Sequence, residues 1–308
     1  MIPFIGNAKT ADHLIDMAER GTFVQGVLFV GPQSVGKTTL AQRISEILLG
    51  SEPSMLSTHP DYFFLQRPAE RTDGGRKRDI PLEAVRELLD RLSLAAMFGK
   101  KVAVIEEAAA LSVQSQNALL KTLEEPTGTA HIFILAENED EVLPTVRSRL
   151  ATVRLSIVSD DELIKAIFSY VASDYERRLL LRMSAGLPGR AFRLLDTEER
   201  SAAELLARQV EDFFALPLAD RVMRSGVIAK MDTEERGGDL ELFLRTSAEY
   251  FADWVKRAST EGEDTVLFTV SSATAGLAAA LEALAGLEKN ANPTIALERL
   301  ALAVPDVK

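Results

Sequence analysis

The chain of 308 residues contains no cysteine and three histidines, His13, His59 and His131. The lack of cysteine excludes disulfide bonds and zinc sites with cysteine ligands, and a reducing cytoplasm is the simplest location. Three scattered histidines argue against a metal site built from several histidines. No apolar run is expected to span a bilayer, and no signal peptide pattern opens the chain. We therefore expect a cytoplasmic protein without a membrane segment.

The chain also has fewer basic than acidic residues: 35 lysines and arginines and 46 aspartates and glutamates give a net charge of −11. This balance argues against a surface that binds nucleic acid broadly by itself. A local exception is the run from Arg71 to Arg78, which holds four basic residues around two glycines. Such a run is typical of a solvated loop, and a loop that contacts phosphate is the alternative.

The pattern of apolar residues predicts an α/β region followed by an all-α region. Up to about residue 155, short apolar strands alternate with helical patterns, as in a mostly parallel sheet covered by helices on both faces. The expected strands are 27–30, 62–65, 102–105, 131–136 and 152–155, and the expected helices are 11–20, 38–49, 82–92, 113–124 and 143–148. Three short helices are then expected over 160–172, 175–185 and 190–195, and from about residue 200 the chain is helical by pattern.

The most informative motif is Gly31-Pro-Gln-Ser-Val-Gly-Lys-Thr38, which fits the pattern G-x-x-x-x-G-K-[ST] at every fixed position. It follows an apolar strand and opens a helix, the context in which such a loop binds the phosphates of a nucleoside triphosphate. Lys37 would reach the outer phosphates, and the Thr38 hydroxyl would bind Mg²⁺. A chance glycine-rich turn before a helix is the alternative. The residues expected to hold the nucleotide are Gly31, Pro32, Ser34, Val35, Gly36, Lys37, Thr38 and Thr39.

Two glutamates, Glu106 and Glu107, follow the apolar strand 102–105. A phosphate loop needs an acid that holds the metal and a group that orients the attacking water. Strand alternation would point the two side chains to opposite sides, but at a strand end the second can turn with the loop. We assign Glu106 to the Mg²⁺ shell, directly or through water, and Glu107 to activation of water. Two solvated glutamates at the end of a buried strand are the alternative.

Further polar candidates follow the strand 131–136 and the segment 143–146. Asn138 is a candidate for sensing the γ-phosphate or holding the water, and an ordinary turn residue is the alternative. Arg147 and Arg149 lie at an expected helix end. Arginine suits bidentate phosphate contact, but two surface arginines are also favourable at a helix C-terminus. The residues alone leave both choices open.

Together these motifs resemble those of the AAA+ ATPases, and specifically of bacterial clamp-loader subunits, over nearly the whole chain. The most specific block is Asn117-Ala-Leu-Leu-Lys-Thr-Leu-Glu-Glu-Pro126, which is close to a family signature. Leu143-Pro-Thr-Val-Arg-Ser-Arg149 is similar to the family's serine-arginine-cysteine motif. The other matching segments are 4–6, 29–39, 59–61, 80–86, 92–94, 290–293 and 296–300.

The resemblance implies three parts: a nucleotide-binding domain over 1–156, a helical lid over 157–200 and a helical collar over 201–308. It implies a five-membered ring with other clamp-loader subunits, which opens the sliding clamp and places it on primed DNA. The implied ligands are ATP or ADP with Mg²⁺, and DNA is expected mainly through the complex. In the family, the arginine that corresponds to Arg149 acts in trans on ATP bound to the neighbouring subunit, where charge builds on the γ-phosphate.

Some positions depart from the family pattern. Leu150 stands where the family has cysteine, which leaves Arg149 intact, and Glu106 stands where a hydrolysing motor usually has aspartate. Gly189 replaces the lid arginine of the motors, and Arg190, our candidate for a nucleotide-binding residue of the lid, sits one position later. The four-cysteine zinc module common in the family is missing. These departures put hydrolysis by this chain itself in question.

Three functional hypotheses follow. The first is a clamp-loader subunit that acts mainly as a ring scaffold and as donor of a trans-acting arginine, with its own nucleotide site. The alternative is an ATP-hydrolysing motor subunit of the clamp loader, or a related AAA+ ATPase. A third, from another class, is a stand-alone nucleotide-switched protein such as a small kinase, against which the implied lid and collar argue.

Overall fold

A computed structural model describes residues 4–68, 79–125, 129–171, 177, 180–181, 183–234, 239–261, 269–288 and 291–305. The basic run Arg71–Arg78 lies outside these residues, as do residues 175–176, 178–179 and 182 of the helix expected over 175–185. The described residues form two compact units, one that ends at Leu195 and one that begins at Asp196.

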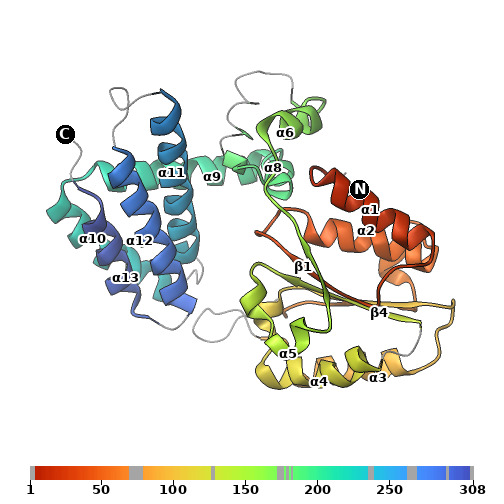
Figure 1. The fold of residues 1–308 in the computed structure, drawn as a ribbon. Helices are drawn as coiled ribbons and strands as arrows, with labels where there is room; N and C mark the ends of the chain where they lie inside the picture. The colour runs from red at the N-terminus through yellow and green to blue at the C-terminus, as the bar shows by residue number, and fades with distance from the viewer. Residues whose placement is uncertain are drawn as a thin grey trace. The chain divides into compact units, whose positions relative to one another are not determined.

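The first unit is built on a five-stranded sheet in which all neighbouring strands are parallel (Figure 1). The strand order is β2-β3-β4-β1-β5. Because the strands are parallel, their carboxyl ends lie at one edge, where Val30 of β1 pairs with Ala136 of β4 and with Arg154 of β5. The strands are β1 (Gly26–Val30), β2 (Tyr62–Leu65), β3 (Lys101–Ile105), β4 (Ala130–Ala136) and β5 (Ala151–Arg154).

Helices cover both faces of the sheet, and alternate strand residues feed two separate cores. Val27 and Phe29 pack with helices α1 and α2 on one face, while Leu28 packs with α3 and α4 on the other. Figure 1 shows these two helical layers on either side of the strands. The helices are α1 (Ala8–Glu19), α2 (Lys37–Leu49), α3 (Leu82–Ser93), α4 (Val113–Glu124) and the short α5 (Pro144–Arg147), with 3-10 turns η1 (Leu56–Thr58), η2 (Ala108–Ala110) and η3 (Glu139–Glu141).

Helices α6 (Asp160–Ile167) and α8 (Pro188–Arg193) complete the first unit. Ser159 caps α6 through a capping box with Glu162, which satisfies backbone N–H groups of the first turn. Gly186 lies before α8 with φ +74°, and its carbonyl accepts a hydrogen bond from the N–H of Val158 at 2.8 Å. A Cβ at position 186 would lie 2.8 Å from the carbonyl oxygen of Val158, so only glycine fits there.

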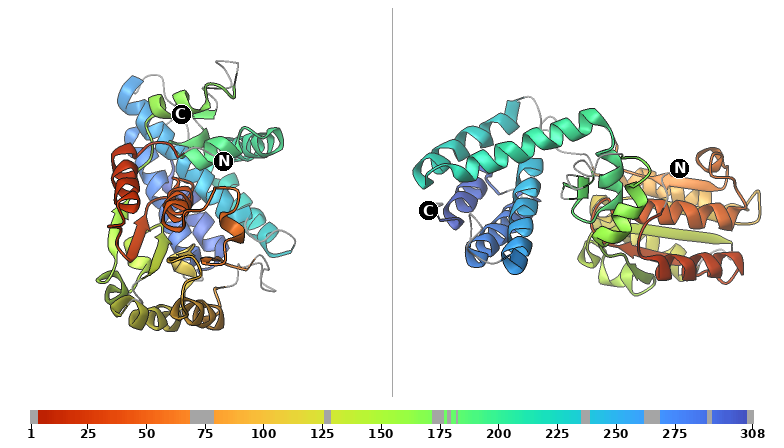
Figure 2. Two further views of the ribbon diagram at one scale, coloured as in Figure 1. Left: turned by 90° about the vertical axis from the view of Figure 1, so that its right-hand side faces the viewer. Right: turned by 90° about the horizontal axis from the view of Figure 1, so that it is seen from above.

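The second unit is all-α, as the sequence predicts (Figure 2). Aromatic side chains form the centre of its core: Phe213 and Phe214 of one helix pack edge to face against Phe243 and Phe251 of another. The side chain of Asp196 accepts hydrogen bonds from two N–H groups of the first helix and fixes its start. The helices are α9 (Thr197–Ala215), α10 (Leu218–Glu234), α11 (Asp239–Glu261), α12 (Val270–Glu288) and α13 (Pro293–Ala303).

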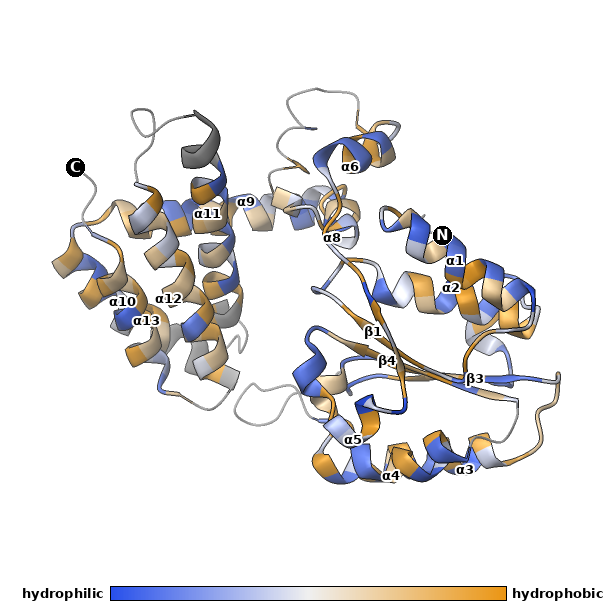
Figure 3. Ribbon diagram, viewed as in Figure 1, coloured by the Kyte–Doolittle hydropathy of each residue, from blue (hydrophilic) through white to orange (hydrophobic). Residues whose placement is uncertain are grey.

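Helix α12 corrects the expectation that no segment is apolar enough to span a bilayer. By length and composition alone, its stretch Val270–Leu287 qualifies, with a mean hydropathy of 1.4 (Figure 3). Four leucines and one valine contribute most of this hydropathy, and seven alanines supply most of the rest. In the structure, α12 packs along α11 and α13, and Ala273, Ala280 and Ala283 lie in the core of the unit. The helix is therefore weak evidence for a membrane segment, since core helices pass the same test.

Close packing of α12 against α11 gives a testable prediction. A Cβ at Gly276 would lie 2.7 to 2.8 Å from ring atoms of Phe251, which is fully buried. We expect Gly276→Ala to lower the free energy of unfolding by about 1–3 kcal/mol, because the core must shift to admit the methyl group. Urea unfolding followed by fluorescence reports on this unit, because the single tryptophan, Trp254, lies in α11.

Gly226 in α10 is the matched control, because a Cβ there would meet no atom within 4 Å. Gly226→Ala is expected to raise the free energy of unfolding by about 0.5–1 kcal/mol through helix propensity. Equal effects of the two alanines would contradict the packing argument.

Candidate functional site

The loop from Gly31 to Thr38 joins the end of β1 to the start of α2. Two glycines make its shape possible. A Cβ at Gly31 would lie 2.5 Å from the carbonyl oxygen of Leu155, and Gly36 has φ +111°, which is strained for other residues. Gly36 is also the N-cap of α2 and brings no capping side chain. The first N–H groups of α2, together with the partial positive charge of the helix N-terminus, therefore form a site for an anion.

Lys37 extends across this loop. Its Nζ donates hydrogen bonds to the carbonyl oxygens of Gly31 at 2.5 Å and Pro32 at 3.0 Å. Burial lowers the pKa of Lys37, and the nearby carboxylates of Glu137, Glu141 and Glu106 oppose that shift. The ammonium group thus lies among the loop carbonyls at the carboxyl edge of the sheet, with acidic residues around it.

Thr38 and Glu106 are brought together from positions 68 residues apart. The hydroxyl of Thr38 donates a hydrogen bond to Oε1 of Glu106 at 2.7 Å. One residue comes from the first turn of α2, and the other follows β3. A hydroxyl and a carboxylate at this distance are the hard oxygen donors that suit Mg²⁺, so the residues fit the metal that the sequence led us to expect.

Glu107 is turned in another direction. Its backbone is left-handed, with φ 59° and ψ 77°, and its Oε2 lies 2.6 Å from Nε of Arg67, which follows β2. The contact is an ion pair rather than a linear hydrogen bond, because Nε–H has no hydrogen-bond partner of good geometry. Arg67 was not among the residues singled out from the sequence. It lies outside every motif, so nothing in the sequence pattern indicated a role for it.

The end of β4 holds a further acidic group that the sequence did not reveal. The carboxylate of Glu141 accepts hydrogen bonds from the N–H groups of Asn138 at 2.9 Å and Glu137 at 3.2 Å. Burial raises the pKa of Glu141, and these two hydrogen bonds oppose the shift. The side chain of Asn138 itself is exposed at this strand end. Glu137 and Glu141 are both close enough to Lys37 to act on its charge.

Helix α8 contacts the phosphate loop directly. The N–H of Gly189 donates to the carbonyl oxygen of Ser34 at 2.8 Å, and Nη2 of Arg193 donates to the Ser34 hydroxyl at 2.9 Å. Arg190, which we predicted as a nucleotide-binding residue of this segment, lies in the same helix three residues before Arg193. Arg193 was not singled out from the sequence.

Arg149 lies at the other edge of the sheet. The carbonyl oxygen of Arg149 approaches Gly26 at the start of β1, whereas the phosphate loop follows the end of that strand. The five residues of β1, Gly26–Val30, extend over about 17 Å. Nη1 of Arg149 donates to the carbonyl oxygen of Thr145 at 2.7 Å, and Nη2 pairs with Glu124 at the end of α4. Arg149 is therefore too far from the phosphate loop of its own chain to contact a nucleotide there.

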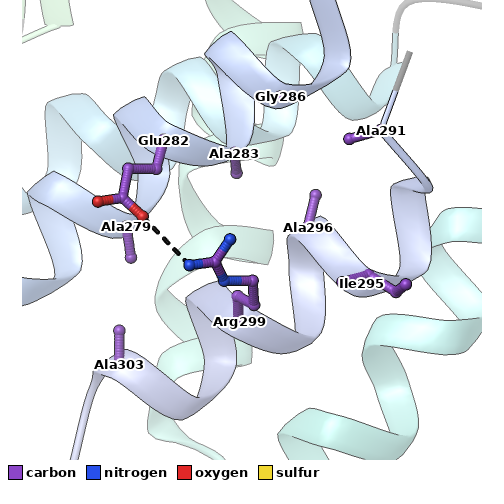
Figure 4. A pocket seen from close by; sticks show the side chains of 9 residues that line it. All are labelled: Ala279, Glu282, Ala283, Gly286, Ala291, Ile295, Ala296, Arg299 and Ala303. Atoms are coloured by element: carbon purple, nitrogen blue, oxygen red, sulfur yellow. Dashed lines mark ion pairs between the residues drawn. The ribbon is translucent and has the colours of Figure 1, made fainter. Parts of the chain in front are cut away.

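A hollow of about 200 Å³ lies in the second unit between α12 and α13 (Figure 4). Glu282 and Arg299 form an ion pair at 3.6 Å across it, and both side chains are mostly exposed. The other residues that line it are Ala279, Ala283, Gly286, Ala291, Ile295, Ala296 and Ala303. Small apolar residues and one surface ion pair provide packing surface rather than catalytic groups.

Comparison with known proteins settles the family. The profile of the family described as "DNA polymerase III, delta subunit" matches residues 6–159, half of the chain. The chain belongs to this family. The match covers the phosphate loop, Glu106, Glu107, Asn138 and Arg149, and it confirms the resemblance to AAA+ clamp-loader subunits.

Relatives of this delta-family chain include two proteins named DNA polymerase III subunit delta'. The one from Pseudomonas aeruginosa is 31% identical over 194 residues, which cover 57% of this chain and 57% of the relative. The one from Escherichia coli is 31% identical over 173 residues, which cover 56% of this chain and 49% of the relative. The chain thus spans about half the length of the curated relatives it matches. Among solved structures, a DNA polymerase III gamma-subunit-related protein from Thermotoga maritima aligns over 96% of this chain and 98% of its own, with a TM-score of 0.49 and 16% identity.

Proposed function

We propose that this chain is a subunit of the bacterial clamp loader, which places the sliding clamp on primed DNA during replication. In this proposal it acts mainly as a scaffold of the ring and as donor of Arg149 to the neighbouring subunit. The observation that carries the proposal is the place of Arg149, at the sheet edge opposite its own phosphate loop. An arginine in that position serves a nucleotide only if the nucleotide belongs to another chain.

We further propose that the chain holds ATP or ADP with Mg²⁺ in its own site. The N–H groups of the loop Gly31–Thr39 and the Lys37 ammonium would bind the phosphates, and Thr38 and Glu106 would hold the metal. Bound Mg²⁺ would neutralise charge on the phosphate oxygens. Support comes from the fit of the loop and from the 2.7 Å contact between Thr38 and Glu106.

Slow hydrolysis is part of the proposal. The candidate base Glu107 is paired with Arg67, so its carboxylate is shared with a cation instead of a water molecule. Gly189 has no side chain that could reach the γ-phosphate. Asn138, with its exposed side chain, stays our candidate for holding the water. A bound nucleotide would then stabilise the subunit more than it would drive a cycle.

The proposed arrangement has three parts: the nucleotide domain 1–156, the lid 157–200 and the collar 201–308. The collar would join the chain to the other subunits of a five-membered ring in the cytoplasm. Because the net charge is −11, contact with primed DNA would be local and would depend mainly on the complex. No membrane contact is proposed.

An ATP-hydrolysing motor subunit of the same loader is the second candidate. The complete phosphate loop and the Thr38–Glu106 pair favour it, because both are parts that a hydrolysing site needs.

Leaving this chain out of the ring tests whether it is a required subunit of the clamp loader. Rings assembled without this chain are expected to load no clamp on primed DNA, and addition of the chain is expected to restore loading. Full loading without the chain would contradict both candidates.

The Thr38–Glu106 pair predicts a metal dependence that binding measurements can check. Glu106→Gln in the isolated chain is expected to abolish most of the gain in nucleotide affinity that Mg²⁺ provides, because a neutral amide is a poorer ligand for a hard cation. Titration of a fluorescent ATP analogue with Mg²⁺ and with EDTA measures this gain. Glu107→Gln is the matched control and is expected to retain it. Loss of the gain in both variants, or in neither, would contradict the assignment of the metal to Glu106.

A further inference from the structure

Helix α8 lies against the phosphate loop through its backbone. The N–H of Gly189 reaches the carbonyl oxygen of Ser34 at 2.8 Å. A Cβ at Gly189 would lie 3.0 Å from that oxygen and 3.3 Å from Cα of Ser34. A side chain at position 189 would therefore require α8 or the loop to shift by a few tenths of an ångström. Glycine here allows α8 to approach more closely than a helix that carried a side chain at this position.

One turn further along α8, Arg193 points to the same loop. Positions four apart lie on one face of a helix, so Arg193 is on the face that Gly189 presents to Ser34. Its Nη2 donates to the Ser34 hydroxyl at 2.9 Å. Ser34 has φ +64° and is the fourth residue of the loop, between the two required glycines. The guanidinium group is thereby held beside the turn whose N–H groups form the anion site.

The charges around the loop favour a second cation at this place. Lys37 lies within the influence of three carboxylates, those of Glu137, Glu141 and Glu106. One ammonium group does not balance three acids, and a nucleotide would bring further negative charge. Arginine remains charged at every physiological pH and can form two parallel hydrogen bonds to a phosphate.

We propose that Arg193 binds the phosphate chain of the nucleotide held by Gly31–Thr38, so that a lid arginine is supplied one helical turn after Gly189. In this arrangement the Ser34 hydroxyl positions the guanidinium group, and the glycine at 189 sets the distance. The inference rests on the proposed nucleotide site and names one more residue that would contact the phosphates there. The ligand class is a nucleoside di- or triphosphate.

The test is equilibrium titration of the full chain with a fluorescent ATP analogue at low and at moderate salt. Arg193→Ala and Arg193→Met are each expected to weaken binding about tenfold, which corresponds to about 1.4 kcal/mol. Arg193→Lys is expected to weaken binding less than Arg193→Ala, because it keeps the charge but loses the two parallel hydrogen bonds. The salt dependence of binding should be less steep for Arg193→Met than for wild type, an effect that lost packing alone would not cause. Arg91→Ala, in α3 on the other face of the sheet, is the matched control and should bind as wild type.

Unchanged binding by Arg193→Met, or binding by Arg193→Lys as weak as that of Arg193→Ala, would overturn the role of Arg193. Wild-type chain that binds no better than Lys37→Ala would overturn the nucleotide site itself, and the inference with it. Gly189→Ala adds an independent test. It keeps the Arg193 side chain but requires α8 to shift from Ser34 by a few tenths of an ångström, so the nucleotide affinity should also fall. Wild-type affinity in Gly189→Ala would contradict the claim that the close approach at 189 positions Arg193.

Discussion

Rings that carry Arg149→Ala in this chain are expected to hydrolyse ATP at the adjoining site about a thousandfold more slowly than wild-type rings. An arginine supplied in trans stabilises charge that builds on the γ-phosphate, and its removal costs about 10³ or more in turnover. Steady-state phosphate release by the reconstituted ring, with clamp and primed DNA present, measures the effect. Where other subunits also hydrolyse ATP, single-turnover measurement isolates the affected site.

In the proposed role, Arg149 would leave its partner within this chain at little cost. Its guanidinium group pairs with Glu124, but the two side chains are 35% and 50% exposed. Surface ion pairs contribute little to stability, about 0–1 kcal/mol. The guanidinium group would therefore need little energy to leave Glu124 and contact a phosphate of the nucleotide that the neighbouring subunit binds. Glu124→Gln should leave turnover close to wild type.

Arg147→Ala is the matched control for Arg149→Ala. Arg147 lies two residues earlier and pairs with Asp140 and Glu139, on the side of the chain that follows β4. Rings with Arg147→Ala are expected to keep most of their turnover. An equal loss in both variants would indicate damage to the segment 143–149 instead of loss of a trans-acting group.

Lys37→Ala should weaken nucleotide binding by the isolated chain about a hundredfold. Hydrogen bonds to charged groups contribute about 1.5–3 kcal/mol, and the ammonium is the central cation of the loop. The same variant leaves Gly31 and Pro32 without the hydrogen bonds that Lys37 donates to their carbonyl oxygens. Titration with a fluorescent ATP analogue measures the loss. Lys121→Ala, at an exposed position of α4, should bind as wild type, and a Lys37→Ala chain that binds normally would contradict the site.

Much of the fold follows from short-range patterns in the sequence. Strand β1 and helix α2 are predicted within one residue because an apolar run ends at a glycine and a helical period starts after the next one. The meeting of Thr38 with Glu106 also follows from the sequence, since the carboxyl ends of parallel strands share one edge. The order of the strands in the sheet and the pairing of β1 with β4 could not be predicted from the sequence and are known from the structure.

Contacts between distant segments escaped prediction for a physical reason. Arg193 meets Ser34 across 159 residues, and no periodicity relates the two positions. Arg67 meets Glu107 because β2 and β3 are neighbours in the sheet, which the strand pattern alone does not show. The apolar character of α12 was underestimated because its leucines are spaced among alanines and small polar residues, so no continuous run of large apolar residues marks the segment, although the mean hydropathy is high.

The central claim is that this subunit serves the ring through Arg149 and not through turnover at its own loop. One measurement compares ATP turnover and clamp loading by rings that carry Lys37→Ala in this chain with those that carry Arg149→Ala. The account predicts that Lys37→Ala rings keep most of their turnover, while Arg149→Ala rings lose turnover at the adjoining site. Loss of turnover in the Lys37→Ala rings together with full turnover in the Arg149→Ala rings would contradict the account and identify this chain as a motor.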